Sequence, residues 1–196
     1  MKINKILAIG AVSLSLAACT TNPITGRKSL QLANNQQIEA MALQQYKETL
    51  SQSKVISGTT AAKQVQNVGR RIANAAQNYY SSIGQADALA NYNWEFNLLE
   101  DKSVNAWCMP GGKVAVYTGL LPVSQTDKGL AVVLGHEVSH ALAGHGNERI
   151  SQAMVAQYGG AILGSTISSA QWANIFSQVY PVGAQVALLK YGRNQE

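Results

Sequence analysis

Apolar and polar residues alternate at helical spacing in two stretches of the first half of the chain. An apolar residue every three or four positions gives a helix one face to bury. We therefore expect helices over residues 34–51 and 60–79, the first with Asn34 or Asn35 as its N-cap. The expected buried positions are Ile38, Met41, Ala42 and Tyr46 in the first helix, and Val65, Val68, Ile72 and Ala76 in the second.

The spacing of apolar residues changes to every second position between residues 91 and 100. This alternation predicts a strand whose apolar face is made of Tyr92, Trp94, Phe96 and Leu98. Two more strands are expected at residues 103–109 and 112–119, around the tight connection Pro110-Gly111-Gly112.

Helical spacing returns after Pro122. A helix capped by Thr126 or Asp127 leads into the segment VVLGHEVSHALAGHGNER, residues 132–149, which contains all three histidines of the chain. We expect this helix to be buried through Val132, Val133, Leu134, Val138, Ala141 and Leu142. Residues 151–189 carry no charged side chain, but polar residues and Pro181 interrupt them. Two helices packed around the histidine helix are therefore expected there, with a membrane-embedded segment as the alternative.

These elements predict an α+β fold, mostly helical, with a small three-stranded sheet packed on the helix that carries the histidines. The length of 196 residues suits one domain. Hydrophobic residues make up 46% of the chain and charged residues 13%, which argues against disorder. The formal net charge is +5, but basic residues are scattered apart from Arg70-Arg71, so we expect no nucleic-acid partner.

The first residues have the pattern of a secretory leader. Lys2 and Lys5 precede an apolar run over 6–18 that is too short to span a bilayer. The residues Leu16-Ala17-Ala18 before Cys19 resemble the bacterial lipobox, whose cleavage leaves a lipid-modified cysteine at the new N-terminus. A plain secretory signal with an incidental cysteine is the alternative.

The lipobox resemblance implies a signal peptide over 1–18, lipidation of Cys19 and a polar tether over 19–33 before a domain at 34–196. Thr20 stands where lipoproteins retained in the inner membrane of enteric bacteria carry aspartate. The resemblance therefore implies an outer-membrane lipoprotein, anchored by its lipid and facing the periplasm. Cys108 would then be the remaining thiol, either buried or available for an intermolecular bond, so no internal disulfide is expected.

The residues His136, Glu137 and His140 form the pattern H-E-x-x-H. On a helix, two histidines four positions apart can direct both imidazoles at one point, as a tetrahedral zinc ion requires. The glutamate between them lies beside the metal, where it can take a proton from a water molecule. The alternative is a helix with chance histidines. Because the flanking residues are apolar, we expect instead one zinc ion that pairs these polar groups.

His145 follows His140 by five residues, not by the six of the H-E-x-x-H-x-x-G-x-x-H pattern. If the helix continued, its side chain would point about 140° away from that of His140. We therefore expect His145 at a helix end or in support of a ligand, and not on the metal. Gly144 and Gly146 around it fit a kink or a helix C-terminus.

Three segments together resemble the HtpX and CAAX-prenyl-protease family of zinc gluzincins, and in particular its soluble periplasmic lipoprotein branch. They are VNAWCMPGG…VYTGLL, LGHEVSHALAGHGNERIS and LLKYGRNQE. The resemblance implies a minigluzincin-like fold and a third zinc ligand at Glu196, the last residue of the chain. The family continues past this glutamate with an aspartate four residues on, so we expect the domain to be truncated at its C-terminus.

The resemblance also implies a substrate-binding strand before the histidine helix. In gluzincins an edge strand pairs with the extended backbone of the substrate. Here Asn105, Ala106 and Trp107 would approach the cleft, and Gly111 and Gly112 would shape the loop beside it. The simpler alternative is a hairpin that only contributes to the core.

Two functions remain open from the sequence. The first is a zinc endopeptidase of the bacterial cell envelope that cleaves polypeptides; the resemblance implies misassembled envelope proteins as substrates, in outer-membrane quality control. The second is a metal-binding chaperone or assembly module at the outer membrane without turnover. The presence of Glu137 favours the enzyme, because binding alone does not require a general base.

Overall fold

The computed structural model describes residues 19–22, 26–159 and 167–180. Its strands are β1 (Cys19–Thr21), β2 (Lys28–Leu30), β3 (Val55–Ile56), β4 (Glu95–Leu99), β5 (Ala106–Met109) and β6 (Lys113–Tyr117). Its α-helices are α2 (Asn35–Gln52), α3 (Thr60–Ser82), α4 (Leu121–Ser124), α5 (Asp127–Leu142), α6 (His145–Tyr158) and α7 (Ser169–Val179). Two short 3-10 helices are η1 (Ala86–Leu89) and η2 (Thr118–Leu120).

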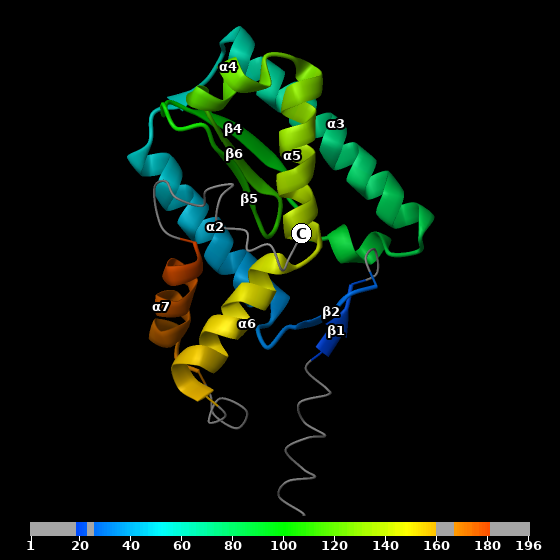
Figure 1. The fold of residues 1–196 in the computed structure, drawn as a ribbon, viewed down its shortest axis with the longest axis vertical. Coiled ribbons are helices and arrows are strands. Elements are labelled where there is room, and N and C mark those ends of the chain that lie inside the picture. Colours follow the sequence, from blue (N-terminus) through cyan, green and yellow to red (C-terminus); the bar gives the residue numbers. More distant parts are fainter. Residues whose placement is uncertain (1–18, 23–25, 160–166, 181–196) are drawn as a thin grey trace, which may run out of the picture.

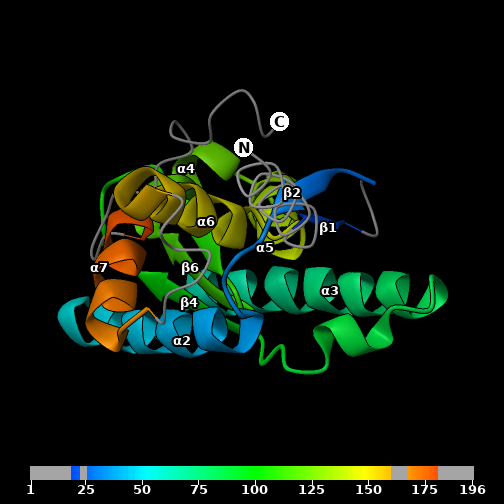
Figure 2. The same cartoon turned by 90° about the horizontal axis from the view of Figure 1, so that it is seen from below.

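A four-stranded sheet lies at the centre of the molecule, in the order β3-β4-β6-β5. The pairing of β4 with β6 is parallel, and the other two pairings are antiparallel. Helices cover both faces, with α3 and α5 on one side and α2, α6 and α7 on the other (Figures 1 and 2). The strand β5 therefore forms one edge of the sheet and packs against α5.

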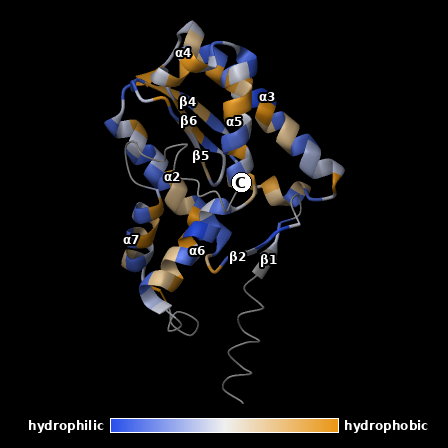
Figure 3. Cartoon of the chain, viewed as in Figure 1, coloured by the Kyte–Doolittle hydropathy of each residue, from blue (hydrophilic) through white to orange (hydrophobic). Residues whose placement is uncertain are grey.

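Alternation along the strands divides the buried apolar residues into two clusters. The cluster on the α3–α5 side includes Phe96, Leu98, Ala106, Cys108, Val114, Val116, Leu130, Leu134 and Val138. The cluster on the other side includes Ile38, Tyr46, Leu99, Trp107, Met109, Ala115, Tyr117, Ile150 and Met154. Figure 3 shows hydrophobic residues both in the central sheet and in the helices around it, which also carry hydrophilic residues. Each face of the sheet thus has its own core.

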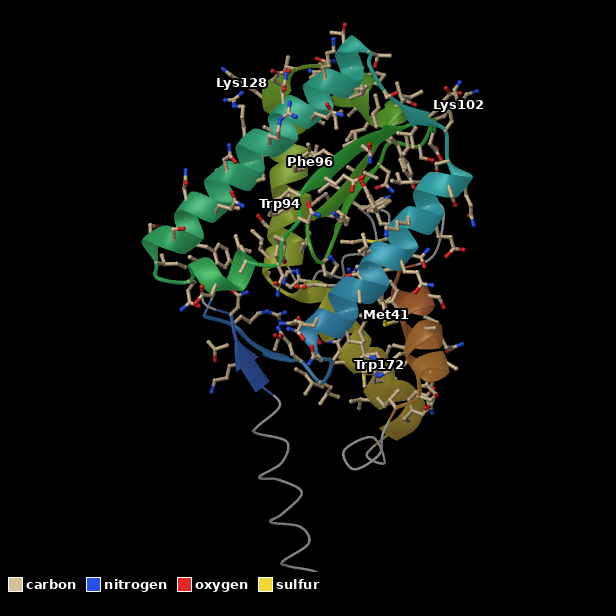
Figure 4. The ribbon with its side chains drawn as sticks, turned by 180° about the vertical axis from the view of Figure 1, so that it is seen from behind. Met41, Trp94, Phe96, Lys102, Lys128 and Trp172 are labelled. Atoms are coloured by element: carbon tan, nitrogen blue, oxygen red, sulfur yellow. The ribbon has the colours of Figure 1, made fainter. Side chains whose placement is uncertain are left out.

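The first cluster contains a close contact between α3 and the sheet, and the second brings α2 and α7 together. Trp94 and Phe96 stack with their ring centroids 6.1 Å apart on the α3 side, and a Cβ added at Gly69 of α3 would lie 2.3 Å from the Phe96 ring (Figure 4). On the other side, Met41 of α2 packs with the cluster that contains Trp172 of α7. These contacts hold α3 and α7 close against the rest of the fold.

The helices and strands confirm most of the pattern in the sequence. The helix α2 begins after Asn34, whose side chain accepts a hydrogen bond from the backbone N–H of Gln36, and α3 begins at Thr60. The three expected strands correspond to β4, β5 and β6. The expected three-stranded sheet is wrong in number, because Val55 and Ile56 add β3 as a fourth strand. A strand of two residues is too short to show a period of two.

The segment 19–33, expected as a tether, includes a small antiparallel hairpin of β1 and β2. The following residues dock on α6: the backbone N–H of Leu32 donates to Ser151 Oγ over 2.8 Å, and Ala33 is buried. The side chain of Arg27 pairs with Glu148. This N-terminal segment therefore supports the first turns of α6. The boundary between tether and domain stays a prediction.

In the described part of the uncharged region, the residues from Ser151 complete α6, which already begins at His145, and α7 follows. Two helices are therefore present as expected, but α7 packs on α6 and not on the histidine helix. Both helices bury apolar residues in the cluster next to α2. Within the described ranges, no helix is both long enough and apolar enough to cross a membrane.

Candidate metal centre

The helix α5 carries the H-E-x-x-H residues, and its start is well defined. Thr126 is the N-cap, with its side chain accepting from the backbone N–H of Gly129. Asp127 in the first turn adds a negative charge where the helix dipole favours one. The preceding helix α4 lies close to this turn, since a Cβ added at Gly129 would be 2.1 Å from the carbonyl oxygen of Ser124.

The three residues of the motif differ in exposure. His136 is exposed, whereas Glu137 and His140 are buried, at 1% and 7% exposure. The expected burial of Val132 is wrong, because its side chain is 74% exposed. A helix that packs on a sheet buries only part of its circumference, and Leu130, Leu134 and Val138 already occupy that side.

The two expected histidine ligands converge. The Nε2 atoms of His136 and His140 lie 2.9 Å apart, with the rings edge to face. Two nitrogen ligands of a tetrahedral zinc ion, each about 2.0–2.1 Å from the metal, lie roughly 3.3 Å from each other. A small change of side-chain torsions would reach that separation. The pair therefore fits a zinc ion in both chemistry and spacing.

A corner after α5 turns the chain back toward these histidines. Gly144 has a φ of 73°, a backbone conformation that residues with a side chain rarely adopt. The helix α6 begins at the next residue, His145. The ring of His145 consequently lies against His140, with their Nδ1 atoms 2.6 Å apart. This contact involves the side of the His140 ring opposite to its Nε2 atom. The expected break in the helix near Gly144 and the place of His145 at a helix end are confirmed. The contact with His140 also agrees with the expectation that His145 lies beside a ligand, although helical spacing did not indicate which ligand it would touch.

The surroundings favour neutral imidazoles at His140 and His145. Burial is the main cause that lowers the pKa of His140 to about 4, and His136, His145 and Arg149 add to the effect. Burial also lowers the pKa of His145, followed by the positive charge of Arg27, while Glu148 acts in the opposite direction. A neutral histidine keeps a lone pair on one ring nitrogen and can bind a metal or accept a hydrogen bond.

The third ligand expected at Glu196 lies outside the described residues. Within the described part of the chain, no group of three histidine, cysteine, aspartate or glutamate side chains is arranged to hold a metal ion. Glu196 as a ligand therefore stays a prediction.

The strand β5, which contains residues expected to contact the substrate, lies at one edge of the sheet. Ala106 and Trp107 belong to β5, and Asn105 comes just before it; all three side chains are buried. The Oδ1 atom of Asn105 is buried and has no hydrogen-bond partner within the described residues. Because β5 is an edge strand, its backbone, and not the apolar side chains of Ala106 and Trp107, is the part suited to pairing with a peptide.

Gly111 and Gly112 form the tip between β5 and β6, both with a φ of 81°. A Cβ at Gly112 would lie 2.8 Å from the Trp94 ring, and one at Gly111 would approach Glu39 of α2. The positive φ explains why both positions favour glycine, and at Gly112 the Trp94 ring adds a steric reason. A substrate contact by either residue stays a prediction.

A cavity of about 420 Å³ lies next to the corner between α5 and α6. Its lining comes from α2, the end of α3, Pro110 and the corner residues Ala141 to Gly144. His136, Glu137 and His140 do not line it. The histidine pair is therefore a better candidate for the chemistry than this cavity, because it carries the metal-binding groups.

Comparison with known proteins identifies the family of the chain. The sequence model of peptidase family M48 matches residues 59–196 of the chain. The chain belongs to this family, which confirms the family expected from the sequence. Among individual proteins, the metalloprotease LoiP of Escherichia coli is 29% identical over 189 residues, which cover 89% of this chain and 69% of LoiP.

Mitochondrial metalloendopeptidases named OMA1 are also similar. The protein of Saccharomyces cerevisiae is 35% identical over 101 residues, or 50% of this chain and 29% of the yeast protein. The protein of Schizosaccharomyces pombe is 41% identical over 63 residues, or 32% of this chain and 19% of its own length. The chain thus spans less than a third of the length of these relatives.

Proposed function

We propose that the protein is a zinc-dependent endopeptidase of the bacterial cell envelope that cleaves polypeptides. The observation that carries this proposal is the convergence of the His136 and His140 Nε2 atoms, 2.9 Å apart, beside the buried Glu137. Membership in peptidase family M48 and the metalloprotease names of its relatives support the same activity.

Three residues of the chain would bind the zinc ion. His136 and His140, with Glu196 as the third ligand, would hold the zinc ion through Nε2 and carboxylate oxygen atoms. Zinc at this position would polarise the scissile carbonyl group and lower the pKa of water toward about 7.

Glu137 would act as the general base and acid. One of its carboxylate oxygens would accept a proton from the attacking water and then donate it to the leaving amine. The position next to His136 in the sequence keeps this carboxylate close to the metal without requiring it to be a ligand. Its burial at 1% exposure limits competition from bulk water.

The edge of β5 would bind the substrate. An extended peptide could add to the backbone of Asn105, Ala106 and Trp107 as a further strand. The Oδ1 atom of Asn105, without a partner in the described structure, could then accept a hydrogen bond from a peptide N–H. Gly111 and Gly112 would keep the neighbouring turn in shape. Side-chain specificity would come from other residues, because Ala106 and Trp107 are buried in the core.

Replacing Glu137 by glutamine tests the mechanism. The amide keeps the shape and the hydrogen-bonding capacity of the side chain but removes the base. Zinc content should stay near one per chain, while hydrolysis of casein falls by about 10²–10⁴-fold, as for a lost general base. The exposed Glu100→Gln is the matched control and should keep parent activity.

Two results would contradict the mechanism. Hydrolysis at the parent rate in Glu137→Gln would remove Glu137 from it. A parent protein that holds zinc stoichiometrically and cleaves nothing would favour the alternative, a metal-binding chaperone or assembly module.

The proposed location is the outer membrane, with the domain in the periplasm and a lipid on Cys19. It rests on the lipobox pattern Leu16-Ala17-Ala18-Cys19. From there the enzyme could reach misassembled envelope proteins, which we propose as its substrates in outer-membrane quality control. Cys19→Ser should abolish labelling by a palmitate analogue and release the protein from the outer-membrane fraction. Unchanged partition of the variant, with no label on the parent, would refute lipid anchoring.

A further inference from the structure

The imidazoles of His136, His140 and His145 form a chain of contacts. The Nε2 atoms of His136 and His140 are 2.9 Å apart, and the Nδ1 atoms of His140 and His145 are 2.6 Å apart. A neutral imidazole carries one N–H and one lone pair. One nitrogen in each contact therefore donates and the other accepts, so the tautomers of the three rings depend on one another.

Metal binding permits only one direction for the hydrogen bond between His140 and His145. If His136 and His140 both bind the ion through Nε2, neither of these atoms can carry a proton. The proton of neutral His140 must then be on Nδ1, and Nδ1 of His145 must accept it. In the opposite arrangement His145 donates to His140 Nδ1, the proton of His140 moves to Nε2, and that atom can no longer bind the metal.

The position of His145 also excludes it as a ligand of the same ion. Its Nδ1 atom lies against Nδ1 of His140, whereas the ion would lie at Nε2, on the other side of that ring. His140 and His145 are both buried, at 7% and 9% exposure, so water is poorly placed to take over the contact.

Contacts around the start of α6 hold His145 in place. The Nδ2 atom of Asn147 donates to the carbonyl oxygen of Ala33 over 2.9 Å and to Oδ1 of Asn35 over 2.7 Å. Arg27 pairs with Glu148 one residue further along. The first turn of α6 is thus fixed by the chain that enters the domain, and His145 is fixed with it.

We propose that His145 is a positioning residue of the metal centre: its Nδ1 atom accepts the Nδ1 proton of His140, and so presents the Nε2 lone pair of His140 to the metal. This inference rests on the proposed function for the metal itself. It assigns to His145 a role in metal affinity that does not involve contact with the metal or with the substrate.

The affinity of the full chain for zinc, measured by competition with a chromogenic chelator, tests the proposal. His145→Leu removes the acceptor and should weaken zinc binding by about 10–100-fold, the usual effect of losing a partner of a ligand. His145→Asn should bind zinc nearly as the parent does, because the Oδ1 atom of asparagine, like Nδ1 of histidine, is bonded to Cγ. Gln152→Leu, at an exposed position of the same helix, is the control and should leave the affinity unchanged.

Nitrogen-15 NMR of the zinc-loaded parent gives a second measurement that does not depend on the folding of any variant. His140 should show a protonated Nδ1 atom that exchanges slowly with water, and a metal-bound Nε2 atom. Metal binding through Nδ1 of His140 would overturn the proposal, as would equal zinc affinity in His145→Leu and the parent, or equal weakening in His145→Asn and His145→Leu.

The outcomes separate this inference from the peptidase proposal. A parent that binds zinc, depends on His145 for affinity and cleaves no peptide would refute the enzyme and support the role of His145. If the parent cleaves peptides and His145→Leu binds zinc as tightly as the parent does, the enzyme is supported and the role of His145 is refuted. A parent that binds no zinc would overturn both.

Discussion

The two sides of α5 have different surroundings. On the side toward the sheet, Leu130, Leu134 and Val138 are fully buried, at 0%, 0% and 2% exposure, against β5 and its neighbours. On the other side, Val132 is 74% exposed and His136 is also exposed, although α4 covers the first turn near Gly129. One side of the helix therefore holds the domain together, and the other presents a proposed metal ligand.

This difference separates stability from chemistry within one helix. Substitutions on the sheet side should change the free energy of unfolding, because they remove buried apolar contacts. Substitutions of exposed side chains on the other side, beyond the first turn that α4 covers, should leave the free energy of unfolding nearly unchanged. Glu137 and His140 lie between these two cases, since they are buried and also belong to the proposed site.

Leu134→Ala should have the largest effect on stability. Leu134 has no exposed surface and packs in the cluster shared with β5, so its loss leaves a cavity. The free energy of unfolding should fall by about 2–5 kcal/mol, measured by urea denaturation. Val132→Ala is the matched control and should change it by less than about 0.5 kcal/mol. Similar losses in the two variants would show that the exposed side of α5 is covered in the folded protein.

Much of the fold could be predicted from the sequence. The helix α2 and the strand β4 show clear periods, and their ends carry recognisable signals such as the Asn34 cap. The strands β1, β2 and β3 have only two or three residues each, so no period could reveal them. The burial of Val132 was predicted wrongly because apolar character alone does not tell which side of a helix meets the sheet.

The candidate site was predictable only where it is local. His136, Glu137 and His140 occupy a single helix, so their relative directions follow from helix geometry. The contact between His140 and His145 depends on the left-handed conformation of Gly144, which reverses the chain. The glycines on both sides of His145 indicated a corner, but not which ring the new helix would bring back.

Gly129→Ala should have an intermediate effect, on the side of α5 away from the sheet. The added Cβ would lie 2.1 Å from the carbonyl oxygen of Ser124, and a backbone atom cannot turn away as a side chain can. The helix α4 must therefore shift, at a cost of about 1–3 kcal/mol, as for overpacked sites. Thermal and urea unfolding would measure the loss. An unchanged midpoint would mean that α4 moves freely on α5.

Gly135→Ala, in the same helix, should have the smallest effect and the opposite sign. Apart from its chain neighbours and the backbone of its own helix, no described atom lies within 4 Å of the Cβ that alanine would add. Alanine also loses less conformational entropy than glycine when it enters a helix. The free energy of unfolding should therefore rise by about 0.5–1 kcal/mol. Gly135 directly precedes His136, but the new methyl group meets no other part of the described structure, so zinc content should stay that of the parent.

Gly129→Ala is the matched control, since the same substitution six residues earlier meets the backbone of α4. If Gly135→Ala lowers the stability instead, another part of the protein must approach α5 beside the histidines, and the open side of this helix would not be open in the folded protein.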